Sequence, residues 1–503
     1  MRRQISDRQL SLLSEYITLR LGLHFPQKRW RDLERIIVNA AAELGFPETG
    51  ECIERIVAGQ LAKEQEEILA GHLTIGETYF FREQKSFDVL EQRILPELIE
   101  SRRGKEQRLR IWSAGCSTGE EPYSLAILIS RLIPDLRDWN ISILATDINN
   151  RALAKAAHGV YGEWSFRGVP EWIRQRHFTR TPDGRLELPH AIRRMVNFAV
   201  LNLAQDSYPS LATNTNAMDI ILCRNVLMYF GQQQQRQVID GFRRSLLEGG
   251  WLVVSPCETS PLFSARFVTV MFPGAVFYKK GDQVGKTDGM APSLPAAAPA
   301  RFTPPAGQPD SPVFSPAAPE KVKQTIPPAE PSPYEEAMTL YRQGSYGEAA
   351  DRLSGLLLHG EASGEALPMF GKAASLLART LANKGDIGMA LEWTEKAIAV
   401  DKLNAELYYL RATILQEQGS VSPTIASLKQ ALYIDHDFVP AHFALGTLTL
   451  QLGKRSEAER HFGNALSLLG RYRADDPVPG AEGMTAARLA EIIAATRESM
   501  KVK

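Results

Sequence analysis

The fold is decided by the stretch Arg108-Leu-Arg-Ile-Trp-Ser-Ala-Gly-Cys-Ser-Thr-Gly-Glu-Glu-Pro-Tyr-Ser-Leu-Ala126. Residues 109–114 predict a short buried strand, and residues 115–119 predict a turn of small residues. Pro122 suits the first turn of a helix that continues through Leu125. A strand, a glycine turn and a helix in this order let the backbone approach a ligand closely at the carboxyl end of a sheet.

The turn differs from two common phosphate-binding motifs. Its spacing, Gly-x-x-x-Gly, lacks both the Gly-x-Gly-x-x-Gly of dinucleotide sites and the Gly-Lys-Ser/Thr of phosphate loops. Glu120 and Glu121 follow the second glycine at once, and two acids would repel a pyrophosphate but suit hydroxyl groups and a cationic ligand. S-adenosylmethionine carries a sulfonium and no phosphate, so it fits this turn better than NAD or ATP.

Composition indicates an intracellular protein of several domains. A chain of 503 residues predicts two to four domains. The 58 basic residues balance the 58 acidic ones, which gives no overall attraction to nucleic acid or to a membrane. The 4 cysteines have no metal-ligand spacing and are typical of reduced thiols. The sequence shows neither a signal-length apolar run nor a membrane-spanning one, so we expect a cytoplasmic protein without direct membrane insertion.

Strands and helices alternate after residue 109, which predicts a parallel sheet with helices on both faces. The strand predicted over residues 141–148 carries Asp147 at its end. An acid one strand-helix-strand unit after a glycine turn is placed to hold a ribose diol. The alternative role for Asp147 is to cap the next helix. Further strands are predicted over residues 196–203, 218–223, 249–255, 267–271 and 276–280.

The chain before the sheet reads as helices from residue 5 to about 98, with apolar residues at helical spacing. Lys28, Arg31 and Arg35 fall at i, i+3 and i+7, with Arg29 beside them, so we expect them on one face of one helix. This face is either an ordinary solvated surface or a docking surface for an acidic partner.

The string from Cys116 to Ser124 resembles the cofactor motif of the chemotaxis receptor methyltransferases, the CheR family. The resemblance covers roughly residues 5–282. It implies a Rossmann-like class I methyltransferase sheet, preceded by an N-terminal helical domain and carrying a small β-subdomain. It also implies S-adenosylmethionine as cofactor and the glutamate side chains of a chemoreceptor's helical bundle as substrate, which would favour a docking role for the basic face.

The resemblance also implies the site residues. Thr-Tyr-Phe-Phe-Arg-Glu at 78–83 matches a family string that lies against the cofactor, with its arginine near the transferred methyl group. Many relatives have Asn two residues before that threonine, where this chain has Gly76, so any contribution there must come from the backbone. The implied catalytic residues are Arg82 and Tyr229, and the implied cofactor-binding residues are Thr78, Arg82, Glu120, Asp147, Asn202, Leu203, Arg224 and Asn225.

A turn signal at Pro182-Asp-Gly184 predicts a small hairpin, similar to the β-subdomain of the family at about residues 165–195. That subdomain touches receptor tails in some members of the family. The turn is short here, so we do not expect it to capture a receptor's terminal peptide.

The second half of the chain has a different organisation. Residues 283–332 hold 12 of the 30 prolines and predict a disordered linker. Gly385, Gly419 and Gly453 are 34 residues apart, a period that resembles the tetratricopeptide repeat. We therefore expect domains at residues 1–98, 99–282 and 333–470, with a partly helical tail at 471–503. The repeats would bind an unknown protein partner, and the long linker predicts that they do not pack rigidly over the active site.

A glutamate carboxylate, with a pKa near 4.3, needs no general base to attack an activated methyl group. The absence of a Ser-His-Asp set from the motifs is therefore expected of a methyltransferase that forms γ-glutamyl methyl esters. Two alternatives remain open. One is a scaffold of low catalytic activity that senses the cofactor and assembles partners, and the other is a small-molecule methyltransferase.

Overall fold

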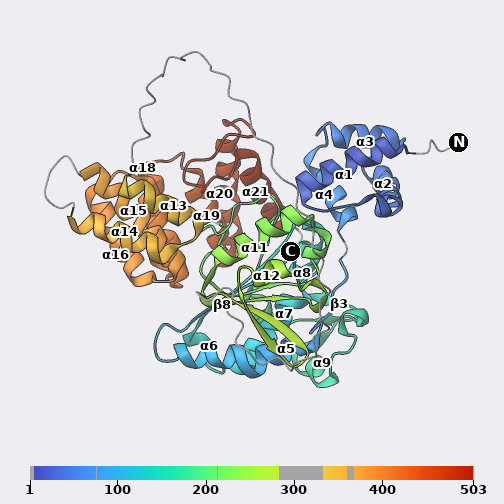
Figure 1. Cartoon of the computed structure of the whole chain (residues 1–503), viewed down its shortest axis with the longest axis horizontal. Coiled ribbons are helices and arrows are strands. Elements are labelled where there is room, and N and C mark those ends of the chain that lie inside the picture. Colours follow the sequence, from blue (N-terminus) through green and yellow to red (C-terminus); the bar gives the residue numbers. More distant parts are fainter. Residues whose placement is uncertain (1–4, 75, 212, 282–331, 360–366, 502–503) are drawn as a thin grey trace, which may run out of the picture.

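The computed structural model describes residues 5–74, 76–211, 213–281, 332–359 and 367–501 (Figure 1). The linker predicted over residues 283–332 falls outside this part of the chain, except for Ser332. Among the described residues, no helix combines the length and the apolar character that crossing a membrane requires.

Four helices come first: α1 (Asp7–Leu21), α2 (Trp30–Glu43), α3 (Thr49–Val57) and α4 (Lys63–Leu73). A capping box starts α1, because the Ser6 hydroxyl accepts the Gln9 N–H while the Gln9 side chain accepts the Ser6 N–H. Gly22, at φ 74°, ends it in the left-handed conformation. A Cβ at Gly22 would lie 2.6 Å from the Cβ of Ala204, so this helix end fits closely against the sheet domain.

A seven-stranded sheet has the strand order β6-β2-β1-β7-β8-β10-β9. The first five strands in this order are parallel, while β10 is antiparallel to both β8 and β9. The predicted parallel sheet is thus confirmed, and β9 and β10 complete it as an antiparallel hairpin. The strands are β1 (Arg108–Ala114), β2 (Asn140–Asp147), β6 (Val196–Val200), β7 (Met218–Cys223), β8 (Leu246–Val254), β9 (Val268–Phe272) and β10 (Ala275–Lys279).

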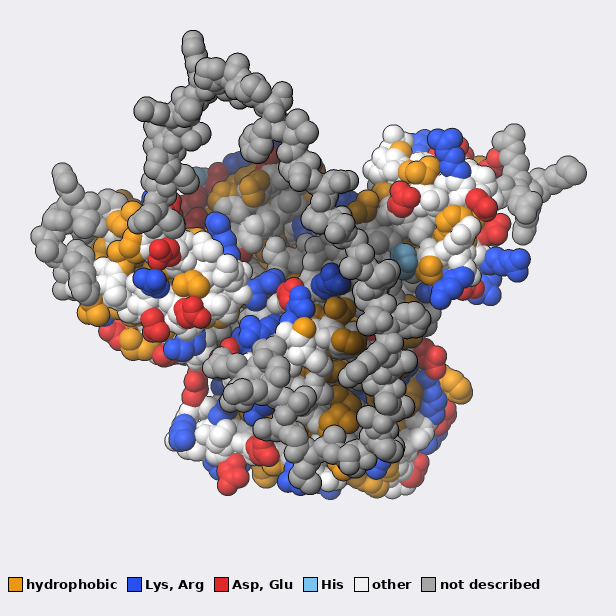
Figure 2. Space-filling view, viewed as in Figure 1, with side chains coloured by type: hydrophobic (Ala, Val, Ile, Leu, Met, Phe, Trp, Pro, Cys, Tyr) orange, Lys and Arg blue, Asp and Glu red, His pale blue; other side chains and the backbone are white. Residues whose placement is uncertain are grey.

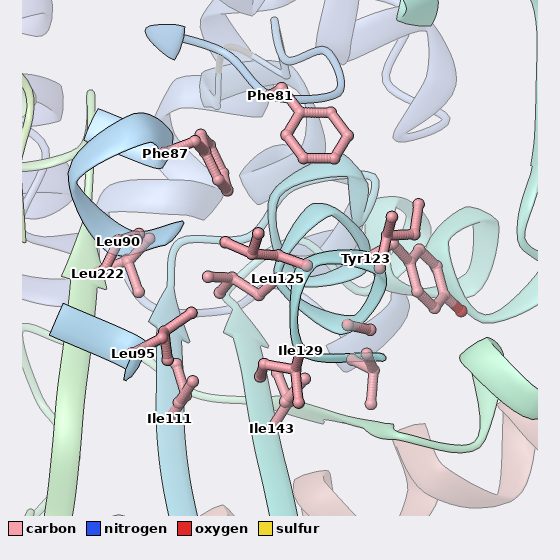
Figure 3. Packing of buried hydrophobic residues seen from close by; sticks show 14 of the residues in the cluster. Phe81, Phe87, Leu90, Leu95, Ile111, Tyr123, Leu125, Ile129, Ile143 and Leu222 are labelled. Carbon is pink, nitrogen blue, oxygen red and sulfur yellow. The ribbon is translucent and has the colours of Figure 1, made fainter. Parts of the chain in front are cut away.

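Helices cover both faces of this sheet. On one face, Leu125 of α7 packs with Ile111 of β1 and Ile143 of β2 (Figure 3). On the other face, Trp112 of β1 packs edge-to-face against Phe242 of α11, with ring centroids 5.4 Å apart. The covering helices are α5 (Gln84–Val89), α6 (Leu95–Arg102), α7 (Glu120–Leu132), α8 (Asn150–His158), α11 (Gln232–Ser245) and α12 (Pro261–Ser264).

A second, three-stranded sheet has the order β3-β5-β4 and is antiparallel throughout. Its β4–β5 hairpin closes through the Thr181 N–H, which donates to the Arg185 carbonyl at 2.9 Å. The predicted hairpin therefore exists. The elements here are β3 (Val160–Tyr161), α9 (Glu171–His177), β4 (Thr179–Arg180), β5 (Leu186–Glu187) and α10 (His190–Arg193).

The C-terminal part is an array of helix pairs. Gly385, Gly419 and Gly453, at φ 88°, 76° and 77°, end the first helix of successive pairs in the left-handed conformation. At Gly446 a Cβ would lie 2.5 Å from the Phe462 ring, so close helix packing requires a small residue there. The helices are α13 (Pro333–Gln343), α14 (Tyr346–His359), α15 (Leu367–Lys384), α16 (Ile387–Val400), α17 (Ala405–Glu417), α18 (Val421–Ile434), α19 (Val439–Gln451), α20 (Arg455–Leu469) and α21 (Ala486–Lys501).

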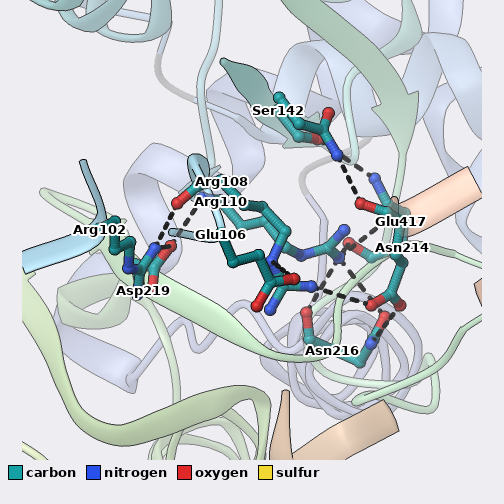
Figure 4. A network of polar contacts seen from close by, with 10 residues as sticks. Arg102, Glu106, Arg108, Arg110, Ser142, Asn214, Asn216, Asp219 and Glu417 are labelled. Carbon is teal, nitrogen blue, oxygen red and sulfur yellow. Dashed lines mark hydrogen bonds and ion pairs between the residues drawn. The ribbon is translucent and has the colours of Figure 1, made fainter. Parts of the chain in front are cut away.

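The array packs against the sheet domain (Figure 1). Glu417, the last residue of α17, is only 5% exposed. Its carboxylate pairs with the Arg108 guanidinium at 3.4 Å and accepts a hydrogen bond of 2.6 Å from the Asn216 amide (Figure 4). Arg108 begins β1 and Asn216 precedes β7, so the array meets the amino ends of the strands. The interface holds the array against the sheet domain, which a tether alone would not do.

We expect Glu417→Ala to lower the free energy of unfolding by about 3 kcal/mol, because Arg108 would stay buried with only the exposed Glu106, 3.6 Å away, as its acidic partner. Glu395→Ala is the matched control, since Glu395 pairs with Arg411 on the array's exposed surface. That change should cost at most about 1 kcal/mol. Urea denaturation followed by circular dichroism measures the free energy of unfolding of both variants. An equal decrease in the two variants would contradict a buried interface.

Candidate functional site

A pocket opens at the carboxyl ends of β1, β2, β6 and β7, opposite the edge that the array covers. Its walls come from four segments of the sheet domain, one after each of these strands, from the loop after α4 and from the N-terminal helices. They include Thr74, Gly76, Glu77, Thr78, Arg82, Gly115, Cys116, Ser117, Glu121, Asp147, Asn149, Asn202, Leu203, Arg224, Asn225, Val226, Tyr229 and Phe230.

The glycine turn after β1 forms the floor. The N–H groups of Gly115 and Cys116 both donate to the Thr146 carbonyl, at 2.7 and 2.9 Å, which ties the turn to β2. Gly115 has φ 83°, and a Cβ there would lie 2.4 Å from a methyl carbon of Val226. Only glycine fits this position, and its lack of a side chain leaves the backbone open to a ligand.

Asp147 joins the turn to α8. Its carboxylate accepts the Ser117 N–H and the Asn149 N–H, both at 2.8 Å. Burial raises the pKa of this carboxyl group above its usual value. Asn149, whose side chain accepts the Ala152 N–H, is the cap of α8, so the capping alternative for Asp147 is wrong. Each carboxylate oxygen has a second lone pair for a ligand hydroxyl.

The two adjacent acids at the start of α7 have different surroundings. Glu120 is 2% exposed, and its carboxylate accepts the hydroxyls of Thr118 and Ser165, away from the pocket. Glu121 lines the pocket and accepts the Ser113 hydroxyl at 2.7 Å. The prediction of Glu120 as a pocket residue is therefore wrong. Successive helix residues project about 100° apart, and the sequence alone does not say which of two neighbours faces inward.

The segment after α4 holds Arg82 in a constrained loop. Phe81 and Glu83, on either side of Arg82, have φ of 56° and 58°, which is unusual for side chains of this size. The Phe81 N–H donates to the Ser124 hydroxyl at 2.9 Å, which ties the loop to α7. The Arg82 guanidinium donates to the Glu77 carbonyl at 2.6 Å and lines the pocket.

Gly76 lies directly beside the glycine turn, since its carbonyl accepts the Ser117 hydroxyl at 3.3 Å. This contact lies within the protein, and a contact of the Gly76 backbone with the cofactor stays a prediction. Thr78 also lines the pocket, as the family motif implied.

Arg224 supports the site from behind. Its buried guanidinium pairs with Glu83 and Glu121, both at 3.0 Å, and donates to the Arg82 carbonyl. It therefore connects the Arg82 loop to the start of α7. Because these bonds engage both terminal nitrogens, Arg224 acts on the pocket through the residues that it holds. Its buried Nε has no hydrogen-bond partner among the described residues.

Asn225 faces the pocket in the left-handed conformation, at φ 59°. Its Oδ1 is buried and has no hydrogen-bond partner among the described residues, which suits a donor from a ligand. Glu258 fixes this loop by accepting the N–H groups of Asn225 and Val226, at 2.6 and 2.8 Å. Glu258 was not predictable from the sequence, because a lone acid after a strand has no distinguishing spacing.

The N-terminal helices close the pocket. Leu21, Leu23 and Leu73 line it, and the Asn202 amide donates to the Arg20 carbonyl at 2.8 Å. The His24 N–H donates to the Tyr229 carbonyl at 2.7 Å, which anchors the loop that carries this tyrosine. These leucines fit the apolar helical pattern of a core, so no sequence pattern indicated that they face a ligand.

The basic face differs from its prediction. Lys28 and Arg29 lie in a 3-10 turn (Gln27–Arg29) before α2, so they do not share a helix with Arg31 and Arg35. Lys28, Arg31 and Arg35 are nevertheless exposed, and basic side chains gather along the outer side of this domain (Figure 2). Asp32 lies among them and pairs with Arg35 at 3.4 Å.

Comparison with known proteins agrees with this geometry. The family described as CheR methyltransferase, SAM binding domain, matches residues 76–272. The chemotaxis protein methyltransferase of Borreliella burgdorferi is 30% identical over 51% of this chain and 89% of its own length. Chemotaxis protein methyltransferase 1 of Pseudomonas aeruginosa is 35% identical over 47% of this chain and 84% of its own.

Another relative matches more of the chain. The probable biofilm formation methyltransferase WspC of Pseudomonas aeruginosa is 29% identical over 69% of this chain and 77% of its own length. A solved MamA structure from Desulfovibrio magneticus covers 28% of this chain at 19% identity and a TM-score of 0.25, a likeness too weak for any conclusion.

The pocket has a glycine turn without phosphate-binding features, a strand-end acid free to accept hydroxyls, and an unpartnered amide oxygen. These features fit S-adenosylmethionine, and relatives at 30% identity or more are matched over most of their length. The chain belongs to the CheR family of S-adenosylmethionine-dependent methyltransferases.

Proposed function

We propose that this methyltransferase esterifies glutamate side chains on the cytoplasmic helical bundle of a chemoreceptor. The observation that carries the proposal is the juxtaposition of Arg82 and Tyr229 in one pocket with Asp147. A cationic side chain and a phenol beside a cofactor site suit a carboxylate substrate. The relatives described as chemotaxis protein methyltransferases support the same substrate class.

Different residues around the pocket would bind different parts of the cofactor. Asp147 would accept the ribose hydroxyls through its remaining lone pairs. Asn202 and Leu203 would lie against the adenine of the cofactor. Thr78 and the unpartnered Asn225 oxygen would contact the polar part of the cofactor. Glu121, rather than Glu120, would face the cationic end of the ligand.

When bound, S-adenosylmethionine supplies a methyl group that its sulfonium activates. A glutamate side chain is ionised at neutral pH and is already a nucleophile, so the protein has to align it and exclude water. Arg82 would steer the substrate carboxylate, and Tyr229 would orient it in the pocket. The methyl ester removes one negative charge from the receptor helix, which shifts its signalling equilibrium.

We expect Asp147→Ala to weaken cofactor binding roughly 30- to 150-fold, because the ribose hydroxyls would lose their acceptor in a desolvated pocket. Calorimetric titration with S-adenosylhomocysteine measures the change. Asp183→Ala, in the exposed β4–β5 turn, is the control and should leave the affinity unchanged. If Asp147→Ala binds as tightly as the wild type, Asp147 does not contact the ribose.

The direct test of the substrate is methylation of receptor-containing membranes with labelled cofactor, followed by mass spectrometry of the receptor peptides. We expect base-labile label on glutamate. Arg82→Gln should lower kcat about 100-fold, since a misplacement of the reacting carboxylate by about 1 Å costs that much. Arg185→Gln, an exposed arginine in the β4–β5 turn, should have no effect. Cofactor binding without any labelled receptor would instead favour a cofactor-sensing scaffold.

We expect the basic face to set receptor affinity without affecting chemistry. Arg31→Glu with Arg35→Glu should raise KM for the receptor about tenfold and leave kcat unchanged, because exposed charges act on encounter with an acidic surface. Lys105→Glu with Arg137→Glu, two exposed charges at the amino edge of the sheet, is the matched control. Steady-state assays at 50 and 300 mM salt should show a weaker salt dependence for the first double variant only.

A further inference from the structure

The segment from residue 201 to 217, which joins β6 to β7, has two roles in the structure. It begins at the pocket, where Leu201, Asn202 and Leu203 form part of the wall. It ends at the repeats, where Asn216 bonds to Glu417. Between these points, Leu211 is buried among the apolar side chains of the repeats. One short segment therefore contacts both the cofactor site and the array.

A two-pronged ion pair fixes this segment to the last helix. The Arg488 guanidinium of α21 donates through Nε to Asp206 Oδ1 and through Nη2 to Asp206 Oδ2, both at 2.7 Å. The side chains of Asp206 and Arg488 are 10% and 23% exposed. A partly buried, bidentate ion pair between a guanidinium and a carboxylate restricts the relative orientation of the two side chains as well as their distance. A single surface contact would not do so.

Asp206 in turn holds the pocket wall. Its Oδ2 accepts the Asn202 N–H at 2.6 Å, and its own N–H donates to the Asn202 carbonyl at 2.8 Å. Asn202 also donates through its amide to the Arg20 carbonyl of α1. A continuous set of hydrogen bonds thus runs from α21, through Asp206, to the wall of the cofactor pocket and on to the N-terminal domain.

We propose that Arg488 is a positioning residue for cofactor binding, and that the C-terminal array sets cofactor affinity from outside the pocket. Arg488 holds the Asp206 carboxylate in the orientation that Asn202 needs. Without Arg488, the pocket wall at Asn202 samples more conformations in the free protein. Cofactor binding then costs more conformational entropy, which weakens binding. The proposal depends on the cofactor and not on the identity of the methylated substrate.

The repeats therefore differ from a tethered docking module. None of the described repeat residues lines the pocket, in agreement with the expectation that the array does not cover it. On this proposal, removal of the array would lower the affinity for the cofactor. A partner that pulls α21 away from Asp206 would weaken cofactor binding, and one that stabilises the contact would strengthen it.

The test is a double-mutant cycle on the full-length chain, with calorimetric titration of S-adenosylhomocysteine. We expect Arg488→Gln and Asp206→Asn each to weaken binding about three- to tenfold, in the range of measured couplings between distant sites. The double variant should bind no more weakly than Asp206→Asn alone, because Arg488 acts through Asp206. Arg411→Gln, which removes an ion pair within the array, is the control and should bind normally.

Thermal melting without ligand distinguishes positioning from stability. A purely structural role predicts a lowered melting temperature with unchanged affinity for the folded variant, and this result would overturn the proposal. Additive losses in the double variant would overturn it as well. If Arg488→Gln does not fold, Arg488→Lys replaces it. Lysine keeps the positive charge but cannot form the two-pronged ion pair, so we expect the affinity for S-adenosylhomocysteine to fall about twofold. Normal affinity would again refute the proposal.

Discussion

The carboxylate of Asp147 is the constraint on which the site depends. It stands at the end of β2 and binds the backbone N–H groups of Ser117 and Asn149, so it fixes the glycine turn and the start of α8 together. The parallel pairing of β1 with β2 and β7 then brings the other polar walls to the same edge of the sheet. Burial raises the pKa of Asp147, and its backbone hydrogen bonds favour the ionised form that a ribose requires.

Much of this arrangement was predictable from local sequence. The strand, the glycine turn and the helix follow from apolar runs and special backbone positions, and a strand-end acid such as Asp147 has few other uses. Local sequence does not decide which of Glu120 and Glu121 faces inward, because both begin the same helix. The sequence also gave no sign that leucines at the end of α1 would close the pocket. Their apolar character suits a protein core and a ligand site equally.

The contact between the two halves could not be read from the sequence at all. Arg108 and Glu417 are 309 residues apart and, taken singly, look like surface charges at the ends of regular elements. Their burial arises only when the array meets the amino ends of the strands, which leaves the carboxyl ends open to cofactor and substrate. The amino ends of the strands thus bind the array, and their carboxyl ends form the pocket. The segment from 201 to 217 connects these two sides of the sheet.

The most direct measurement is a crystal structure of the full-length chain with S-adenosylhomocysteine bound. The account predicts that both ribose hydroxyls lie within hydrogen-bonding distance of the Asp147 carboxylate. The adenine should lie against Leu203, and the sulfur should face Arg82 and Tyr229, with the Arg488–Asp206 pair intact. A ligand seated elsewhere, or ribose hydroxyls turned away from Asp147, would contradict the account.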